Sequence, residues 1–277
     1  MKLFDAILLG IVQGLAEFLP ISSSGHLSVF QSFFGLSQTG TDNLFFDVLL
    51  HLGTLAAVFV AYWGEIKGMI LEFFTMVGLR KLPQGQKPDR LSRRLIFFII
   101  VATLPLVVVL PVKDYVDGLY GNTFFIGFAF LLTGTLLFLS DRMIRGNKDL
   151  KSATIVDVLL VGCAQAVAVV PGLSRSGSTI AAGLSRGFSR EFATKFSFLL
   201  SIPAVLGANL LSLVDAVQEG IDWSLMPMYI AGVVTAAVCG YLAIRLLKFI
   251  TRRGSFGAFC YYCWGAGLVT LILSLIK

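Results

Sequence analysis

Charged residues are scarce in this chain. Only 14% of its 277 residues are Asp, Glu, Lys or Arg, whereas 56% are hydrophobic, and the mean hydropathy is +0.85. Soluble globular domains carry about 25% charged residues, so the composition excludes that class. The sequence therefore predicts an integral membrane protein.

Cysteine is also scarce, with four residues in the whole chain. Cys260 and Cys263 form a C-x-x-C pair, but the pair lies on an apolar run without a nearby His or acidic residue. Packing is therefore the favoured interpretation, rather than a metal or redox site. A cleaved signal peptide is not expected, because Glu17 and Pro20 interrupt the first apolar stretch and no A-x-A site follows.

Long apolar runs are present, and six of them can cross the roughly 30 Å of hydrocarbon in a bilayer. We expect transmembrane helices at about 44–63, 95–112, 123–140, 196–213, 225–244 and 256–276. Two further apolar stretches, 3–36 and 153–190, are each broken near the middle by proline and small polar residues. We expect each to form a re-entrant helical hairpin that protein or a water-filled cavity surrounds.

The basic residues are unevenly distributed, which bears on topology rather than on nucleic-acid binding. Most Lys and Arg residues gather in four segments, 67–94, 142–151, 186–195 and 245–253. In the connections 113–122 and 214–224, Lys113 is the only Lys or Arg residue. The positive-inside rule places the four basic segments in the cytoplasm and both termini outside. This assignment requires each broken stretch to enter and leave the membrane on one side.

An internal repeat relates two parts of the chain. The segment GIVQGLAEFLPISSSGHL from Gly10 aligns with GCAQAVAVVPGLSRSGST from Gly162, at a shift of 152 positions. A second pair of similar segments follows: FDVLLHLGTLAAV from Phe46 resembles FSFLLSIPAVLGA from Phe196. The repeat predicts two halves with the same order of elements.

The halves, about 1–145 and 146–277, are expected to form one all-α membrane domain over residues 1–277. Each half contains a hairpin and three spans, and three is odd, so the halves must have inverted topology. The first hairpin would then enter from outside and the second from the cytoplasm. Inverted repeats with broken helices place helix N-termini near the membrane middle, where their N–H groups attract anions. We therefore expect the two polar tips to meet there.

Hydroxyl, imidazole, carboxylate and guanidinium groups are concentrated in these tips. The residues are Glu17, Ser22, Ser23, Ser24 and His26 in the first tip and Ser174, Arg175, Ser176, Ser178 and Thr179 in the second. Gly25, Gly172 and Gly177 let backbone amides approach a ligand closely. An Arg in lipid costs about 2.5–3.5 kcal/mol by insertion scales, so Arg175 needs an anionic partner. The combination predicts a phosphate-binding site.

Plainer interpretations apply to single residues. Ser and Gly in membrane helices usually serve close helix packing, which suits an isolated Ser but not this cluster. His51 follows Asp47 by four positions on one helical face and could join a proton relay, although an interior histidine with satisfied hydrogen bonds explains the pair equally well. Asp157, near the start of the second broken stretch, can act as a helix cap.

At these residues the sequence resembles a known family. GIVQGLAEFLPISSSGHL and PGLSRSGSTI are similar to motifs of the undecaprenyl-diphosphate phosphatases, the bacitracin-resistance family of bacterial inner membranes, and the similarity covers essentially the whole chain. The resemblance implies removal of the terminal phosphate from undecaprenyl diphosphate, which releases undecaprenyl phosphate for peptidoglycan and other wall polymers. It also implies a need for Mg²⁺ or Ca²⁺ and resistance to bacitracin, which competes for the lipid rather than binding the protein.

The same resemblance assigns roles to residues. The catalytic positions match Glu17, Ser23, His26 and Arg175. The positions around the phosphates match Ser22, Ser24, Gly25, Ser174, Ser176, Gly177 and Thr179. Gln13 stands where some members have a first Glu, which leaves Glu17 as the only carboxylate of this motif and the expected metal ligand. Gln13, Asp47 and His51 are secondary candidates.

Ser23 is the predicted nucleophile, with His26 as its proton-transfer partner. Positions i and i+3 share one face if the chain is helical after Pro20, and His is well matched to proton transfer near neutral pH. Two rival mechanisms stay open at this stage. In one, His26 attacks phosphorus directly, and in the other a metal-activated water attacks without a covalent intermediate.

A membrane transporter is the competing class of function. Inverted repeats and broken helices are common in transporters, and a lipid-phosphate flippase would also need Arg175 and a Ser-lined pocket. A structural membrane scaffold would give no reason for Glu17 and Arg175 at depth. We expect polyprenyl diphosphate and membrane lipids as partners, no nucleic acid, and a multi-pass inner-membrane protein whose active site faces the periplasm. A homodimer is left open.

Overall fold

The computed structural model describes residues 1–34, 42–82, 87–143, 146–219, 221–253 and 256–276, and these residues form helices without any named strand. The α-helices are α1 Leu3–Phe18, α2 Ser23–Phe34, α3 Asp42–Ala61, α4 Trp63–Met76, α5 Arg90–Thr103, α6 Lys113–Asp117, α7 Thr123–Asp141, α8 Ile155–Val167, α9 Arg175–Ser185, α10 Arg190–Glu219, α11 Met226–Arg253 and α12 Gly257–Ile276. Two 3-10 helices complete the order, η1 Leu104–Val112 and η2 Trp223–Leu225.

Five helical segments of the described chain are long and apolar enough to cross a membrane. They are Arg90–Val116, Thr123–Asp141, Arg190–Gln218, Trp223–Arg252 and Gly257–Ile276. A sixth span results if the bent pair Phe45–Ala61 and Trp63–Met76 counts as one. The predicted class, an all-α polytopic membrane protein, is confirmed at this level.

The predicted spans at 44–63 and 95–112 are less regular than expected. The chain bends by 89° where α3 meets α4, and α4 was not predicted as a helix because Glu65, Lys67 and Glu72 interrupt its apolar pattern. The span that begins with α5 changes to a 3-10 helix at Leu104. Two prolines lie in that 3-10 helix, and proline lacks the N–H that an α-helix interior needs.

Two helical hairpins occupy the expected positions and match each other in detail. Helix α8 starts 152 positions after α1, and α9 starts 152 positions after α2, which is the shift of the internal repeat. Each hairpin begins with the same cap, because Asp5 accepts from the backbone N–H of Lys2, and Asp157 accepts from that of Thr154, both at 3.0 Å. The expectation that Asp157 caps its helix is confirmed.

Each hairpin packs against a helix of the other half of the chain. Helix α1 lies on α11, and α8 lies on α5. The contact is close at an equivalent glycine in both cases, since a Cβ on Gly10 would lie 2.6 Å from the Gly232 carbonyl oxygen and one on Gly162 would lie 2.3 Å from that of Ala102. Only glycine allows these backbones to approach so closely.

Gly162→Ala is expected to destabilise the fold. The added methyl group would overlap backbone atoms of α5, and overpacking of this kind costs about 1–3 kcal/mol of unfolding free energy. Thermal unfolding of the purified protein in detergent measures the change. Gly265→Ala is the matched control, because a Cβ at Gly265 meets nothing within 4 Å. Equal melting temperatures for the two variants would contradict the packing described.

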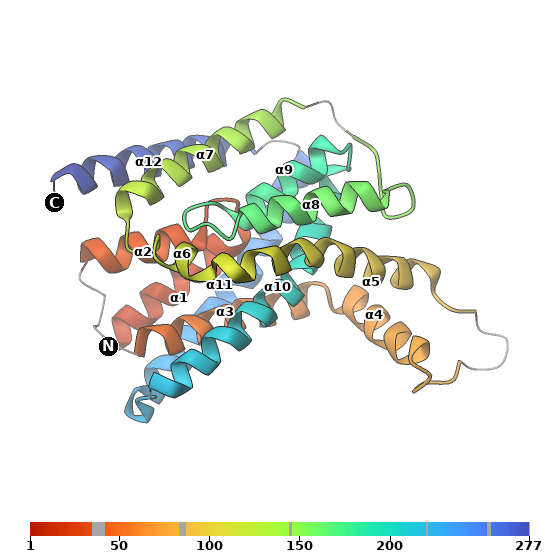
Figure 1. The fold of residues 1–277 in the computed structure, drawn as a ribbon, viewed down its shortest axis with the longest axis horizontal. Coiled ribbons are helices and arrows are strands. Elements are labelled where there is room, and N and C mark those ends of the chain that lie inside the picture. The colour runs from red at the N-terminus through yellow and green to blue at the C-terminus, as the bar shows by residue number, and fades with distance from the viewer. Residues whose placement is uncertain (35–41, 83–86, 144–145, 220, 254–255, 277) are drawn as a thin grey trace.

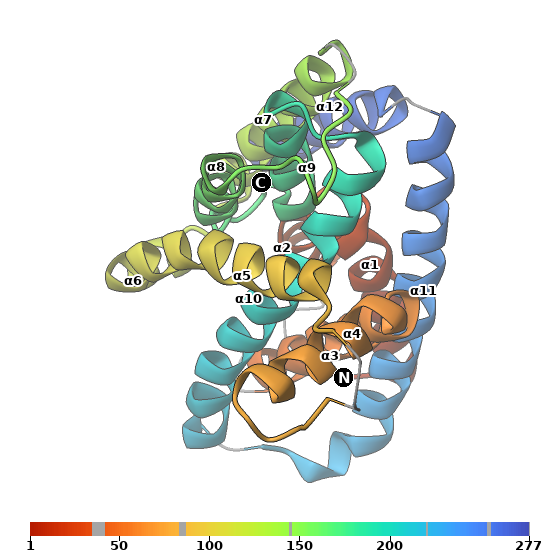
Figure 2. The ribbon, with the colours of Figure 1, turned by 90° about the vertical axis from the view of Figure 1, so that its right-hand side faces the viewer.

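The helices are arranged with the chain termini at one end and the long basic connections at the other (Figure 1). Both ends of the hairpin α1–α2 point toward the termini, whereas both ends of α8–α9 point toward the connection between α4 and α5 (Figure 1). Helix α3 packs between α10 and α11, as Figure 2 shows. The two hairpin tips consequently meet inside the bundle from opposite ends.

Candidate active site

The two tips have the same local construction. Helix α2 begins directly after Ser22, whose backbone φ of +72° is the left-handed conformation that reverses the chain. The Ser22 hydroxyl accepts from the Gly25 N–H at 3.3 Å. In the second tip Gly172 has φ of +86°, and the Ser174 hydroxyl accepts from the Gly177 N–H at 3.1 Å. Each serine thus caps a helix N-terminus, which satisfies one of its free donors.

Hydrogen bonds join the two tips directly. The Gly172 N–H donates to Ser24 Oγ at 3.4 Å, and the Ser176 hydroxyl donates to the Leu19 carbonyl at 3.3 Å. Arg175, the first residue of α9, forms an ion pair with Glu17, near the end of α1. The prediction that the polar tips meet is therefore confirmed.

Glu17 is the centre of the polar cluster. One carboxylate oxygen accepts from Arg175, and the other accepts from the Ser23 hydroxyl at 2.7 Å and from Gln13 Nε2 at 3.1 Å. His51 Nε2 lies 3.9 Å from the second oxygen. The Glu17 carboxylate is nearly fully buried, so its charge depends on these partners rather than on water. A hydroxyl held this close to a carboxylate can lose its proton to it.

His26 and Ser23, the pair predicted to exchange a proton, form hydrogen bonds with other residues in the structure. The Nδ1 of His26 donates to the Ser22 carbonyl at 2.7 Å, because a carbonyl can only accept. Its Nε2 lies 2.8 Å from the Tyr262 hydroxyl, and the two rings stack with an interplanar angle of 13°. Both nitrogens of the imidazole are therefore engaged. Although Ser23 and His26 are three positions apart, the carboxylate and not the imidazole reaches the Ser23 hydroxyl.

Several buried polar atoms of the cluster lack a hydrogen-bond partner among the described residues. They include Arg175 Nη1, Gln13 Oε1 and Asp47 Oδ1. A buried donor or acceptor without a partner costs about 1–3 kcal/mol, so such atoms call for a ligand or ordered water. The free Arg175 N–H group lies beside the hydroxyl-rich helix N-termini, where an anion binds favourably.

Comparison with known proteins agrees with this geometry. The sequence profile of the family described as bacitracin resistance protein BacA matches residues 6–269. The chain belongs to the BacA family. It is 42% identical over 277 residues to the undecaprenyl-diphosphatase of Alkaliphilus metalliredigens, with all of both chains covered. It is 40% identical to the undecaprenyl-diphosphatase of Halothermothrix orenii, with 99% of each chain covered.

A further relative of this BacA family member is undecaprenyl-diphosphatase 3 of Bacillus cereus. The two are 39% identical over 274 residues, which cover 99% of this chain and 98% of the relative. The similarity thus extends over both hairpins and all the helices that carry the polar cluster. It is not confined to a motif.

Three residues that contact the polar cluster were missed by the sequence analysis. Tyr262 contacts His26, Thr133 accepts from the Ser174 N–H at 3.1 Å, and Ser197 lies 2.6 Å from the Thr179 hydroxyl. They lie on α12, α7 and α10, outside both repeated motifs. A single polar residue in an apolar helix was the only signal available, and most such residues serve helix packing.

The protein oxygens at this site suit a hard divalent cation only in part. No group of three or more His, Cys, Asp or Glu side chains suited to a metal occurs among the residues that the structure describes. Gln13 Oε1 is a buried oxygen without a partner, one helical turn before the Glu17 carboxylate. Mg²⁺ typically takes one or two carboxylates and completes its shell with water and substrate phosphates. The oxygens of Glu17 and Gln13 fit a cation shared with a substrate rather than a protein-only metal centre.

Proposed function

We propose that this chain hydrolyses the terminal phosphate of undecaprenyl diphosphate, giving undecaprenyl phosphate and inorganic phosphate. The observation that carries the proposal is the cluster of Glu17, Ser23 and Arg175 at the meeting point of two helix N-termini. It lies in an apolar helical bundle of a membrane protein, and the lipid tail of the substrate is soluble in the surrounding bilayer. Relatives of about 40% identity over the whole chain carry the name undecaprenyl-diphosphatase.

The first chemical step assigns the nucleophile to Ser23 and the base to Glu17. Arg175 exchanges its carboxylate partner for the substrate phosphates, which also give its buried Nη1 the hydrogen-bond partner that it lacks. The Glu17 oxygen that accepts the hydrogen bond from the Ser23 hydroxyl then takes its proton. Ser23 Oγ bonds to the terminal phosphorus, the bond from that phosphorus to the bridging oxygen breaks, and undecaprenyl phosphate leaves with the bridging oxygen.

The second step returns the enzyme to its starting state. Water attacks the phosphorus of phosphorylated Ser23, the serine oxygen leaves with the proton held by Glu17, and inorganic phosphate is released. Capping serines and amide groups at the starts of α2 and α9 stabilise the charge on the transferred group. These residues include Ser22, Ser24, Gly25, Ser174, Ser176, Gly177 and Thr179.

His26 has a positioning role in this proposal. Its hydrogen bond to the Ser22 carbonyl holds the left-handed residue that precedes α2, and Tyr262 fixes the imidazole from the other side. Ser23 is the next residue, so the pair sets the direction in which its hydroxyl points. This replaces the expected proton transfer between Ser23 and His26.

We propose that Glu17 and Gln13 hold a divalent cation, Mg²⁺ or Ca²⁺, together with the substrate. When bound, the cation neutralises charge on the diphosphate oxygens. His51 lies next to Glu17, with its Nε2 3.9 Å from the carboxylate. Its Nδ1 donates to the backbone carbonyl of Asp47 at 2.8 Å. Recycling of the carrier would raise resistance to bacitracin, because the antibiotic competes for the diphosphate lipid.

We propose a topology of six spans and two re-entrant hairpins in one membrane domain, with inverted halves. The support comes from the ends of the bundle. Lys248 Nζ donates to the Ala61 carbonyl, and Arg94 donates to the Ala153 carbonyl, so distant basic connections gather at one end. Lys113 of α6 pairs with Asp215 of α10. Helix α6 and the end of α10 lie at the other end, toward both termini (Figure 1). The basic end would be cytoplasmic, and the site would open to the periplasm through the first hairpin.

Cysteine labelling in intact bacterial cells tests this orientation. In a variant without native cysteines, Gly121→Cys is expected to react with a membrane-impermeant maleimide, whereas Lys87→Cys is expected to react only after permeabilisation. Both positions are exposed, and a side chain at Gly121 meets nothing within 4 Å. The opposite labelling pattern would invert the topology and place the site on the cytoplasmic face.

A transporter is the second candidate, because paired broken helices around a phosphate site also suit a flippase. Detergent-purified protein separates the two functions, since no membrane remains to be crossed. The enzyme proposal predicts release of inorganic phosphate from undecaprenyl diphosphate in detergent. Absence of release, together with movement of the lipid between leaflets of reconstituted vesicles, would favour the transporter.

A further inference from the structure

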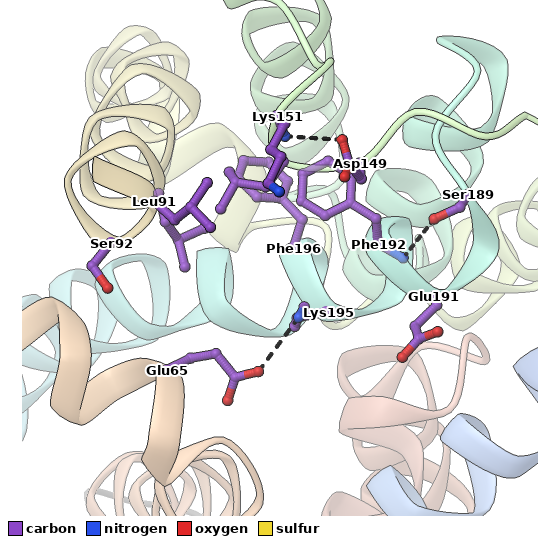
Figure 3. A pocket seen from close by; sticks show the side chains of 12 residues that line it. Glu65, Leu91, Ser92, Asp149, Lys151, Ser189, Glu191, Phe192, Lys195 and Phe196 are labelled. Atoms are coloured by element: carbon purple, nitrogen blue, oxygen red, sulfur yellow. Dashed lines mark hydrogen bonds and ion pairs between the residues drawn. The ribbon is translucent and has the colours of Figure 1, made fainter. Parts of the chain in front are cut away.

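A cavity lies at the basic end of the bundle, away from the hairpin tips. Its volume is about 390 Å³, within the roughly 300–1,000 Å³ of small-molecule sites. The starts of α4, α5 and α10 and the connection before α8 form its wall. Figure 3 shows Glu65 and Lys195 on one side, Lys151 and Asp149 on the opposite side, and the rings of Phe192 and Phe196 between them.

The charged groups of this cavity leave one cation and one anion available. Lys195 pairs with Glu65 at 3.4 Å, and the Asp149 carboxylate accepts from the Lys151 backbone N–H and from Ser152. No described residue forms a hydrogen bond or ion pair with the side-chain ammonium of Lys151 or the carboxylate of Glu191, although Lys248, outside the cavity lining, interacts electrostatically with Glu191. The cavity therefore presents one ammonium and one carboxylate that have no hydrogen bond or ion pair among the described residues, above an apolar floor.

An apolar groove continues the cavity along the same three helices. It has a volume of about 540 Å³ and is lined only by hydrophobic residues and Pro203 of α4, α5 and α10. Leu95 lines the cavity and Ile99 the groove, and Phe196 lines the cavity and Leu199 the groove. Residues three or four apart are neighbours on one helix face, so the groove starts one turn beyond the cavity. A charged head site is thus continuous with an apolar channel.

We propose that this cavity and groove bind one zwitterionic phospholipid of the phosphatidylethanolamine class. The phosphodiester would pair with Lys151, and the primary ammonium would pair with Glu191. One acyl chain would lie in the groove against exposed apolar side chains such as Phe73 and Ile100. The site would hold a lipid of the cytoplasmic leaflet and is separate from the catalytic cluster.

The charges on the cavity wall disfavour other lipids. Three carboxylates and two ammonium groups line it, so an anionic phosphatidylglycerol or a polyprenyl phosphate would find no cation-rich site and would leave Glu191 without a partner. A zwitterion satisfies both free groups at once. The proposal does not depend on the phosphatase activity, and the two can fail separately.

Native mass spectrometry of the full chain in detergent tests the proposal with defined lipids. Dioleoyl phosphatidylethanolamine is expected to bind at least tenfold more tightly than dioleoyl phosphatidylglycerol. Glu191→Lys should reverse this order, because the cavity then carries two free cations. Lys87→Ala is the matched control, since Lys87 is exposed outside both lining sets, and it should leave the order unchanged.

A second variant tests the groove independently. Ile100→Trp should fill part of the channel and weaken phosphatidylethanolamine binding at least tenfold, and tail-free glycerophosphoethanolamine should not compete at equal concentration. Unchanged phosphate release by both variants would show that they are folded. Equal affinity for the two lipids, tighter binding of undecaprenyl phosphate, an unchanged preference in Glu191→Lys, or a dimer that Ile100→Trp dissociates would overturn the proposal.

Discussion

Ser23→Ala is expected to reduce phosphate release from undecaprenyl diphosphate almost to the uncatalysed rate. The variant removes the hydroxyl that lies 2.7 Å from the buried Glu17 carboxylate, and with it the covalent intermediate. Loss of a single hydrogen-bond donor to the transition state costs about 10²- to 10³-fold. A nucleophile is expected to cost more than that, and steady-state phosphate release measures the difference.

Ser28→Ala is the matched control for this variant. Ser28 lies on the same helix and donates to the Tyr120 carbonyl, outside the polar cluster. Its loss should affect stability by roughly one hydrogen bond, about 1 kcal/mol, and leave turnover close to that of the parent chain. Turnover in Ser23→Ala within 10³-fold of the parent would show that Ser23 is not the nucleophile and would favour attack by His26 or by water.

Replacing Arg175 is expected to have the second large effect, and the size of the loss distinguishes geometry from charge. Arg175 contacts Glu17 through Nη2, and its buried Nη1 has no partner within the described chain. This arrangement lets the guanidinium bind two oxygens of a phosphate at once, which an ammonium cannot do. Arg175→Lys should therefore lose nearly as much kcat/KM as Arg175→Ala.

Arg186→Lys provides the control on the same hairpin. Arg186 pairs with the buried Asp157 at 2.9 Å and lies at the far end of α9 from the cluster. Lysine can keep that ion pair, so activity should stay near that of the parent. Activity of Arg175→Lys close to the parent value would reduce Arg175 to a point charge and remove the bidentate contact from the mechanism.

Much of the helical arrangement was predictable because it follows from long apolar runs. The predicted spans 123–140 and 256–276 correspond to α7 and α12, and the break at Pro20 marks the end of the first hairpin arm. The bend between α3 and α4 was not predictable. It places an amphipathic helix at the basic end. Charged residues on one face interrupt the apolar sequence of such a helix, so a search for long apolar runs does not find it.

The members of the candidate site were predictable, but the contacts between them were only partly so. The repeat and the resemblance identified Glu17, Ser23 and Arg175, which the structure brings together. The hydrogen-bond partner of Ser23 in the structure is Glu17 and not the predicted His26. The spacing along α2 places His26 on the same face as Ser23, but it does not show that the end of α1 brings Glu17 close to the start of α2. Tyr262 is 236 positions from His26, and no local pattern connects them.

Trapping the phosphorylated enzyme tests the central claim most directly. Purified protein would be quenched in acid during turnover of undecaprenyl diphosphate labelled in its terminal phosphate, then digested and analysed by mass spectrometry. Our account predicts an acid-stable phosphoserine at Ser23, which is absent from Ser23→Ala and unaffected in Ser28→Ala. An acid-labile phosphohistidine at His26, or full turnover with no label on the protein, would contradict it.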